Sequence, residues 1–199
     1  MTVRAIFFDL GGVIVRTDYQ APREHLAERL NTTYEDLSRI VFDSESSRQA
    51  SIGSITTDAH WKAVTRRLGR PASEAKAIRQ EFFAGDVVDM ELIAFIRSLR
   101  PRYKTGVISN AWPDLRQDLV GKRIDDAFDD MIISSEVGIM KPDPKIFEIA
   151  LEKLGVAARE AAFVDDTAVN VNAARALGMQ GVLFREPRRA LNDLKGIMK

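Results

Sequence analysis

The chain has 199 residues, of which 45% are hydrophobic and 29% charged, enough for one hydrophobic core with a small inserted module. Its 29 basic and 29 acidic residues give a formal net charge of zero, so the sequence provides no strong field for nucleic acid or an anionic membrane. It has no cysteine, which excludes disulfides, zinc–thiolate sites and cysteine nucleophiles. Because we find neither a secretory leader pattern nor a long apolar run, we expect a cytoplasmic protein without a membrane span.

The first expected element is the apolar run Ala5–Phe8, which is typical of a strand buried on both faces of a parallel sheet. It is followed by the carboxylate of Asp9 and by two glycines, Gly11 and Gly12. Open α/β sheets bind their ligands beyond the carboxyl ends of the strands, and glycines let a ligand approach the backbone closely. A solvated aspartate in a turn would also fit this pattern. Asp9 is therefore a candidate site residue whose role depends on its neighbours.

The segment from Arg16 to about Gly85 is predicted to be helical, without a convincing strand. Four stretches combine capping residues with apolar residues at helical spacing: Pro22–Leu30, Thr33–Phe42, Thr56–Leu68 and Pro71–Phe83. They predict a bundle of four or five short helices. Because this insert follows the first strand, we expect residues 16–85 to form a helical cap over a core of residues 1–15 and 86–199.

The rest of the chain alternates between expected helices and strands. The strands are predicted at Thr105–Ser109, Met131–Ser134, Ala161–Val164 and Gly181–Phe184, and the helices at Val88–Leu99, Leu115–Lys122, Pro144–Leu154 and Ala168–Leu177. This alternation predicts an α/β fold, a Rossmann-like doubly wound parallel sheet with helices on both faces.

Polar residues lie at or just beyond the carboxyl ends of the predicted strands, so we expect them to converge on one crevice. They are Asp9, Ser109, Asn110, Lys141, Asp165 and Asp166. Taken singly, Ser109 and Asn110 also suit a turn, Lys141 suits a solvated loop, and the two acids suit a helix N-cap. Two adjacent acids at a buried strand end are nevertheless costly unless a cation neutralises them.

Phosphoryl transfer requires groups of these kinds. Carboxylates suit Mg²⁺, a hard cation that prefers oxygen ligands and that reduces the repulsion between a carboxylate and an anionic phosphate. A hydroxyl and an ammonium group can hold the other phosphate oxygens, and an aspartate can act as a covalent nucleophile. The residues therefore predict a magnesium-dependent enzyme that acts on a small phosphorylated substrate.

Four segments resemble, in order and spacing, the motifs of the haloacid dehalogenase (HAD) superfamily, whose members are mostly phosphatases. They are Phe8–Val13, Val107–Asn110, Gly138–Pro144, and Phe163–Thr167 continuing to Ala173–Met179. The resemblance covers the whole chain, and the helical insert is similar to the small α-helical cap of the family.

The resemblance implies a role for each candidate residue. Asp9 would be the nucleophile and a magnesium ligand, while Ser109 and Lys141 would bind phosphate. Asp165 and Asp166 would complete the metal site, with Asp166 as the expected direct ligand. Asn110 would line the phosphate pocket.

Gly11 departs from the pattern of most family phosphatases, which have a second aspartate at this position. That aspartate protonates the leaving oxygen, whereas a glycine leaves only its backbone carbonyl, which the family uses as a metal ligand. Because such an acid–base group contributes about 10²–10⁴ in rate, we expect a slower enzyme or a substrate with an acidic leaving group, such as an anomeric sugar phosphate. The first motif resembles that of a subgroup similar to glucose-1-phosphate phosphatases and to the N-terminal phosphatase domain of soluble epoxide hydrolases. Gly53–Thr56 resembles the cap of the same subgroup. Asp18 is a candidate substitute for the missing acid.

Two alternatives remain open at this point. A catalytically weak or silent family member would bind a phosphorylated ligand or a partner protein, and Gly11 favours this hypothesis. A haloacid dehalogenase would also use Asp9 as its nucleophile, but it needs no metal, and the pair Asp165–Asp166 argues for one. His60 is expected to lie on a helix surface or to pack within the insert, and not to bind a ligand. Trp112 is expected either to pack or to line the mouth of the pocket.

Overall fold

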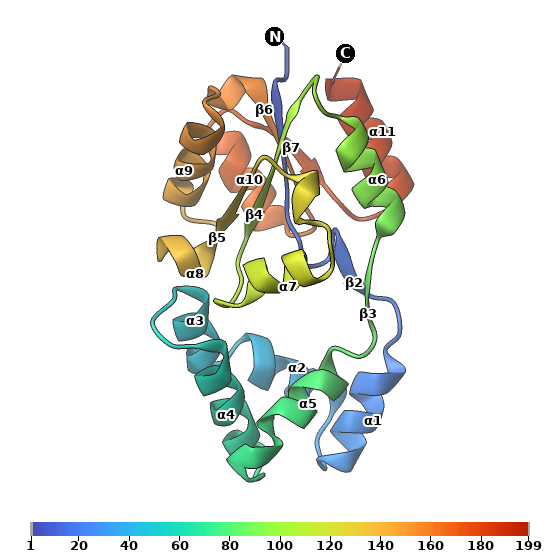
Figure 1. Cartoon of the computed structure of the whole chain (residues 1–199), viewed down its shortest axis with the longest axis vertical. Coiled ribbons are helices and arrows are strands. Elements are labelled where there is room, and N and C mark those ends of the chain that lie inside the picture. The colour runs from blue at the N-terminus through green and yellow to red at the C-terminus, as the bar shows by residue number, and fades with distance from the viewer. Residues whose placement is uncertain (1, 199) are drawn as a thin grey trace.

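The computed structural model describes residues 2–198 and contains a five-stranded parallel sheet (Figure 1). The strand order is β5-β4-β1-β6-β7, and the strands are β1 (Ala5–Phe8), β4 (Lys104–Ser109), β5 (Asp130–Ile133), β6 (Ala161–Asp165) and β7 (Gln180–Leu183). The predicted α/β fold is confirmed, and each strand begins and ends within one residue of its predicted bounds.

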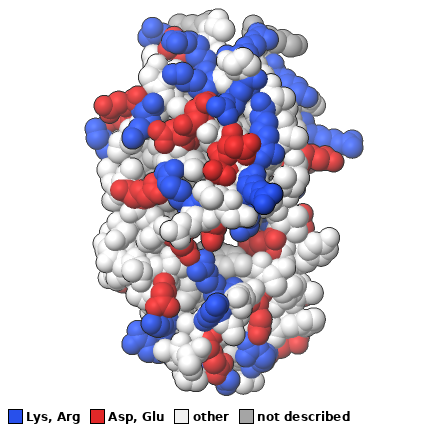
Figure 2. All heavy atoms as spheres, in the orientation of Figure 1, with Lys and Arg blue, Asp and Glu red and all other residues white. Residues whose placement is uncertain are grey.

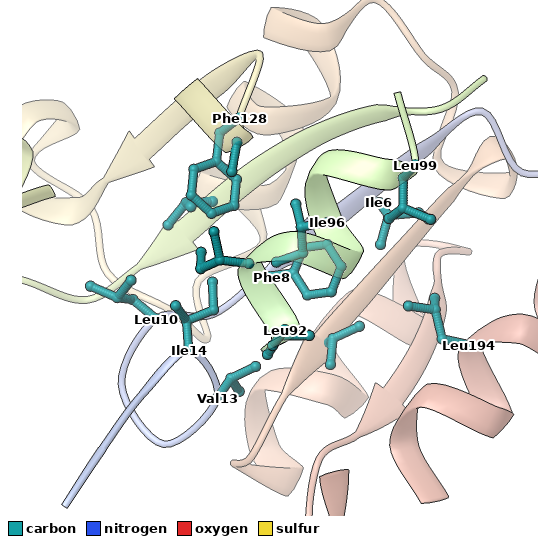
Figure 3. Packing of buried hydrophobic residues seen from close by; sticks show 14 of the residues in the cluster. Ile6, Phe8, Leu10, Val13, Ile14, Leu92, Ile96, Leu99, Phe128 and Leu194 are labelled. Atoms are coloured by element: carbon teal, nitrogen blue, oxygen red, sulfur yellow. The ribbon is translucent and has the colours of Figure 1, made fainter. Parts of the chain in front are cut away.

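Alternate residues of the strands enter two separate hydrophobic cores, one on each face of the sheet. Ile6 and Phe8 face α6 (Met90–Ser98), α7 (Leu115–Gly121) and α11 (Pro187–Ile197), and Figure 3 shows Phe8 beside Leu92 and Ile96. Ala5 and Phe7 face α9 (Pro144–Leu154) and α10 (Ala168–Ala176). All four residues of β1 are fully buried, as expected for a central strand of a parallel sheet.

Five helices form a second unit at the end of the molecule opposite the two termini (Figure 1). They are α1 (Ala21–Arg29), α2 (Tyr34–Phe42), α3 (Glu45–Ser51), α4 (Thr57–Arg67) and α5 (Ala75–Phe82). Side-chain oxygens of Thr33, Ser44 and Thr56 cap α2, α3 and α4. Leu37, Trp61, Ile78 and Phe82 belong to a hydrophobic cluster of the bundle itself.

A two-stranded antiparallel ribbon connects the bundle to the sheet. It consists of β2 (Val15–Thr17) and β3 (Asp86–Val88). Because β2 extends into the segment from Arg16 to about Gly85, the prediction that this segment contains no strand was wrong. The helix predicted from Val88 begins at Met90 instead, because the Asp89 side chain accepts a hydrogen bond from the Leu92 amide and caps it. Three-residue strands are too short to show a periodic pattern, and their pairing depends on a partner distant in sequence.

Two further helices, α8 (Ser134–Val137) and α11, were not among the predicted elements, and α3 was not predicted individually. Among residues 2–198, no helix is both long enough and apolar enough to cross a membrane. On the face shown in Figure 2, basic and acidic side chains are interspersed.

Candidate active site

Asp9 and Lys141 form an ion pair at the carboxyl edge of the sheet. Asp9 follows β1, and its Oδ1 accepts a hydrogen bond from the Leu10 amide at 2.7 Å. The Nζ of Lys141 lies 2.8 Å from the same oxygen and also donates to Oδ2 of Asp165 at 2.7 Å. All three residues are buried, so the lysine ammonium lies between two carboxylates that have little access to water.

Hydrogen bonds from α10 and its N-terminus hold Asp165 in place. Asp165 ends β6, and its Oδ1 accepts a hydrogen bond from the Thr167 amide at 2.7 Å. The Nδ2 of Asn170 donates to both oxygens of Asp165, at 3.1 and 3.2 Å. Asn170 was not predicted as a site residue. The feature of the sequence that could have indicated it is its position in the first turn of the helix that follows the acid pair.

Asn110 fixes the backbone of Lys141. Its Oδ1 accepts a hydrogen bond from the Lys141 amide at 2.7 Å, and its Nδ2 donates to the Lys141 carbonyl at 2.9 Å. Both polar groups of the side chain therefore contact the lysine main chain. Ser109, the last residue of β4, is buried beside Asn110, and both residues line the large cavity described below.

Three carboxylates lie close enough together to share one cation. One oxygen each of Asp9, Asp165 and Asp166 lies within 4.8 Å of the other two. Such a set of oxygens suits a hard divalent cation such as Mg²⁺. Gly12 makes this arrangement possible, because its backbone has a φ of +74° and a Cβ at this position would collide with the Asp166 carboxylate. The residues present thus fit a magnesium ion.

The electrostatics of the cluster favour an added cation. Burial raises the pKa of Asp9 to about 6, against the lowering effect of Lys141 and with a further increase from Asp165. Asp166 is exposed but partly desolvated, which raises its pKa, and Asp165 adds to this effect. Three carboxylates with one ammonium group leave excess negative charge, which a bound cation would neutralise.

A cavity of about 960 Å³ separates the edge of the sheet from the helical bundle. Leu10, Gly11, Gly12 and Ser109 line it next to Asp9, whereas Asp18 is not among its lining residues. Asp18 is instead half exposed and 3.7 Å from Arg16. The structure therefore does not place this candidate acid at the cavity wall.

The carboxylates that do line the cavity are held by arginines. Asp86 accepts a hydrogen bond from Arg23 at 2.8 Å. Asp114 and Asp118 both lie near Arg79, at 2.6 and 3.5 Å. None of the described lining carboxylates is thus free of an ion pair.

Trp112 both packs against the bundle and lines the cavity, which are the two positions expected for it. It lines the cavity, and its ring centroid lies 4.4 Å from that of His60, which is fully buried in the bundle. Of the two positions expected for His60, a helix surface or packing within the insert, the structure shows the second.

The parallel α/β sheet gathers these polar residues at its carboxyl edge, which is where open sheets of this class bind their ligands. A family model for haloacid dehalogenase-like hydrolases matches residues 3–178, and the chain belongs to this family. The resemblance of the four sequence motifs is thereby confirmed.

Three similar proteins cover nearly the whole chain. "Bifunctional epoxide hydrolase 2" of Rattus norvegicus is 25% identical over 99% of this chain, which spans only 39% of that protein. "Sesquiterpene phosphatase astK" of Aspergillus oryzae is 28% identical, covering 99% of this chain and 97% of its own length. A HAD family enzyme from Bacteroides thetaiotaomicron, crystallised with magnesium and inorganic phosphate, has a TM-score of 0.77 at 23% identity, over 92% of this chain and 94% of its own.

Proposed function

We propose that the protein is a magnesium-dependent phosphatase that hydrolyses a small phosphomonoester through an aspartyl-phosphate on Asp9. The observation that carries this proposal is the buried ion pair of Asp9 with Lys141, which lies within a cluster of three carboxylates beside a large cavity. A carboxylate nucleophile, a neighbouring cation and a metal site are what transfer of a phosphoryl group to aspartate requires.

The magnesium ion would be held by Asp9, the backbone carbonyl of Gly11, Asp165 and Asp166. When bound, it would supply positive charge that lowers the repulsion between phosphate and carboxylate. Both oxygens of Asp165 are already engaged by Lys141, Thr167 and Asn170, whereas Asp166 is exposed. This difference supports Asp166 as the direct ligand and Asp165 as a residue that also positions Lys141.

In the first step, an oxygen of Asp9 attacks phosphorus and the bond to the ester oxygen breaks. The electron pair of that bond stays on the leaving oxygen, which takes a proton from solvent. Lys141 and Ser109 hold the phosphoryl oxygens during the transfer. In the second step, the oxygen of a water molecule attacks phosphorus, and the Asp9 carboxylate leaves, releasing inorganic phosphate.

We further propose that residues 16–85 form a cap that closes over the core of residues 1–15 and 86–199. The bundle and the sheet edge both line the cavity, which supports this division. Closing a cap limits the access of bulk water to the reacting groups. Because Gly11 supplies no acid, substrates with acidic leaving groups are favoured, and an anomeric sugar phosphate is one such class.

Two relatives support this proposal. The Aspergillus protein, which matches this chain over nearly its full length, is named a phosphatase. The Bacteroides enzyme with the same fold was crystallised with magnesium and phosphate, which is the pair of ligands that the proposed reaction needs.

Release of inorganic phosphate from a panel of phosphate esters and acetyl phosphate, with Mg²⁺ and with EDTA, tests the proposal. We expect release that requires Mg²⁺ and that Asp9→Asn abolishes. Asp58→Asn, on the exposed surface of α4, is the matched control and should retain the activity. Absence of release from the whole panel would instead favour a silent member that only binds phosphorylated ligands.

A further inference from the structure

Three aromatic side chains line the cavity beside the candidate active site. Phe42, Phe83 and Trp112 all line it, and Phe42 is 46% exposed. The Phe42 and Trp112 rings are stacked with centroids 6.2 Å apart, and Phe83 meets both edge-on at 6.5 and 6.2 Å. These three residues, called the aromatic wall below, present ring faces and edges on which another flat ring can pack.

The aromatic wall joins the two halves of the molecule. Phe42 ends α2 and Phe83 follows α5, whereas Trp112 belongs to the loop after β4 that also carries Asn110. Asp114 in the same loop accepts a hydrogen bond from Thr57 at 2.8 Å and pairs with Arg79 at 2.6 Å. A group bound against this wall therefore lies between the bundle and the loop next to Ser109.

The described residues that line the cavity offer no free carboxylic acid to protonate the leaving group. Gly11 has no side chain, and the described carboxylates of the cavity lining are all held by arginines. An ordinary alcohol leaves poorly as its alkoxide, whereas a phenol is far more acidic and leaves readily as a phenolate. The chemistry thus requires an acidic leaving group, and the wall offers contacts to an aromatic one.

We propose that the aromatic wall binds the leaving group of an aryl phosphate, so that the substrates are phosphomonoesters of phenols. This inference rests on the phosphatase function proposed above and names its substrate class. The cavity of about 960 Å³ is at the upper end of typical ligand sites and leaves room for a fused ring system. The phenolate departs with the electron pair of the broken P–O bond and then takes a proton from water.

Four substrates test the inference: 2-naphthyl phosphate, n-octyl phosphate, glucose 1-phosphate and acetyl phosphate. Acetyl phosphate has an activated leaving group too small to reach far along the wall. We expect the KM for 2-naphthyl phosphate to be about tenfold lower than that for glucose 1-phosphate, because one ring contact of moderate strength contributes a binding free energy of that size. Trp112→Ala and Phe83→Leu should each lower the ratio of kcat/KM for 2-naphthyl phosphate to that for acetyl phosphate by about tenfold. Tyr34→Ala, which removes an aromatic ring of α2 that does not line the cavity, should leave this ratio unchanged.

Binding of naphthylmethylphosphonate, which cannot be hydrolysed, separates this inference from the phosphatase proposal. We expect Mg²⁺-dependent binding by the wild type that Phe83→Leu weakens and Tyr34→Ala does not. If acetyl phosphate is hydrolysed but glucose 1-phosphate or n-octyl phosphate is preferred over 2-naphthyl phosphate, the aromatic substrate class is wrong and the phosphatase stands. If no substrate is hydrolysed while the phosphonate binds at the wall, the phosphatase proposal fails and the aromatic site stands. Absence of binding overturns the aromatic site.

Discussion

The Nζ of Lys141 lies 2.8 Å from Oδ1 of Asp9, and the lysine side chain is only 1% exposed. The same ammonium is 2.7 Å from Asp165, which is fully buried. A charge that is withdrawn from water to this extent is stable only when it is paired and hydrogen-bonded. We therefore expect Lys141 to stabilise the buried acid cluster in addition to its role in the proposed chemistry.

Lys141→Met should leave Asp9 and Asp165 buried without a cation. Removing one partner of a buried ion pair costs about 3–5 kcal/mol, so we expect a loss of this size in the free energy of unfolding, measured by urea titration without Mg²⁺. Added Mg²⁺ should reduce the loss, because a cation that binds only the folded state stabilises it. Lys145→Met, which removes an exposed lysine paired with Glu148, should change the stability by less than about 1 kcal/mol. Equal effects of the two substitutions would contradict the role of Lys141.

Gly11→Asp should restore an acid to the site. An added Cβ at Gly11 would meet no atom within 4 Å, and its φ lies outside the left-handed region, so the backbone accepts a side chain. We expect kcat for alkyl phosphates to rise by about 10–10², a part of what a positioned acid provides, with a smaller rise for aryl phosphates. Gly11→Asn, which has the same shape without the acid, is the control. A rise in both variants would show that proton donation is not the cause.

Gly12→Ala should weaken magnesium binding. The new methyl group would displace the Asp166 carboxylate, and the positive φ of the backbone adds strain of about 1 kcal/mol. Gly69→Ala provides the matched control, because Gly69 has a φ of +69° with no atom near its added Cβ. Both variants should lose similar stability. Only Gly12→Ala should raise the Mg²⁺ dissociation constant, by about tenfold or more in calorimetric titrations. An unchanged constant would show that Asp166 does not bind the metal.

The sequence was sufficient to predict the sheet, because the buried strands are continuous apolar runs and parallel strands direct the residues after them to one edge. The proximity of Asp9, Lys141 and Asp165 follows from that rule. The ribbon of β2 and β3 was missed because strands of three residues, none of them buried, carry no periodic signal. The contacts of Asn110 with the Lys141 main chain, and the joining of Trp112 to the aromatic residues of the bundle, depend on how loops approach one another, which no local pattern records.

Arg23→Met should destabilise the junction between bundle and ribbon. Arg23 is buried, donates to the Phe82 carbonyl at 2.9 Å and to Asp86 at 2.8 Å, and lies 4.1 Å above the Phe82 ring. Its removal leaves Asp86 with Thr17 as its remaining side-chain partner, so we expect a loss of about 2–4 kcal/mol in unfolding free energy. Arg29→Met on the same helix removes an exposed pair with Glu81 and should cost less than about 1 kcal/mol. Similar losses for the two variants in urea titrations would contradict this assignment.

His60 should make the folded state sensitive to acid. It is fully buried, its Nδ1 is 2.9 Å from Ser46 Oγ, and in the described part of the chain its Nε2 has no partner. Burial lowers the pKa of His60 to about 4 against the raising effect of the nearby Val41 backbone, and Arg79 adds to the lowering. Between this pKa and the ordinary value of 6.5, the unfolded chain binds more protons than the folded one. Stability is therefore fully present above about pH 6.5 and falls as the pH decreases towards 4, by up to about 1.4 kcal/mol per pH unit from this residue.

Urea titrations across this pH range should show a steeper loss of stability in the wild type than in His60→Gln. The comparison of slopes excludes the constant cost of replacing a buried ring, because that cost shifts the whole curve without tilting it. His25→Gln, which changes an exposed histidine of α1, should have the slope of the wild type. Parallel curves for the wild type and His60→Gln would show that the buried imidazole is not the source of the acid sensitivity.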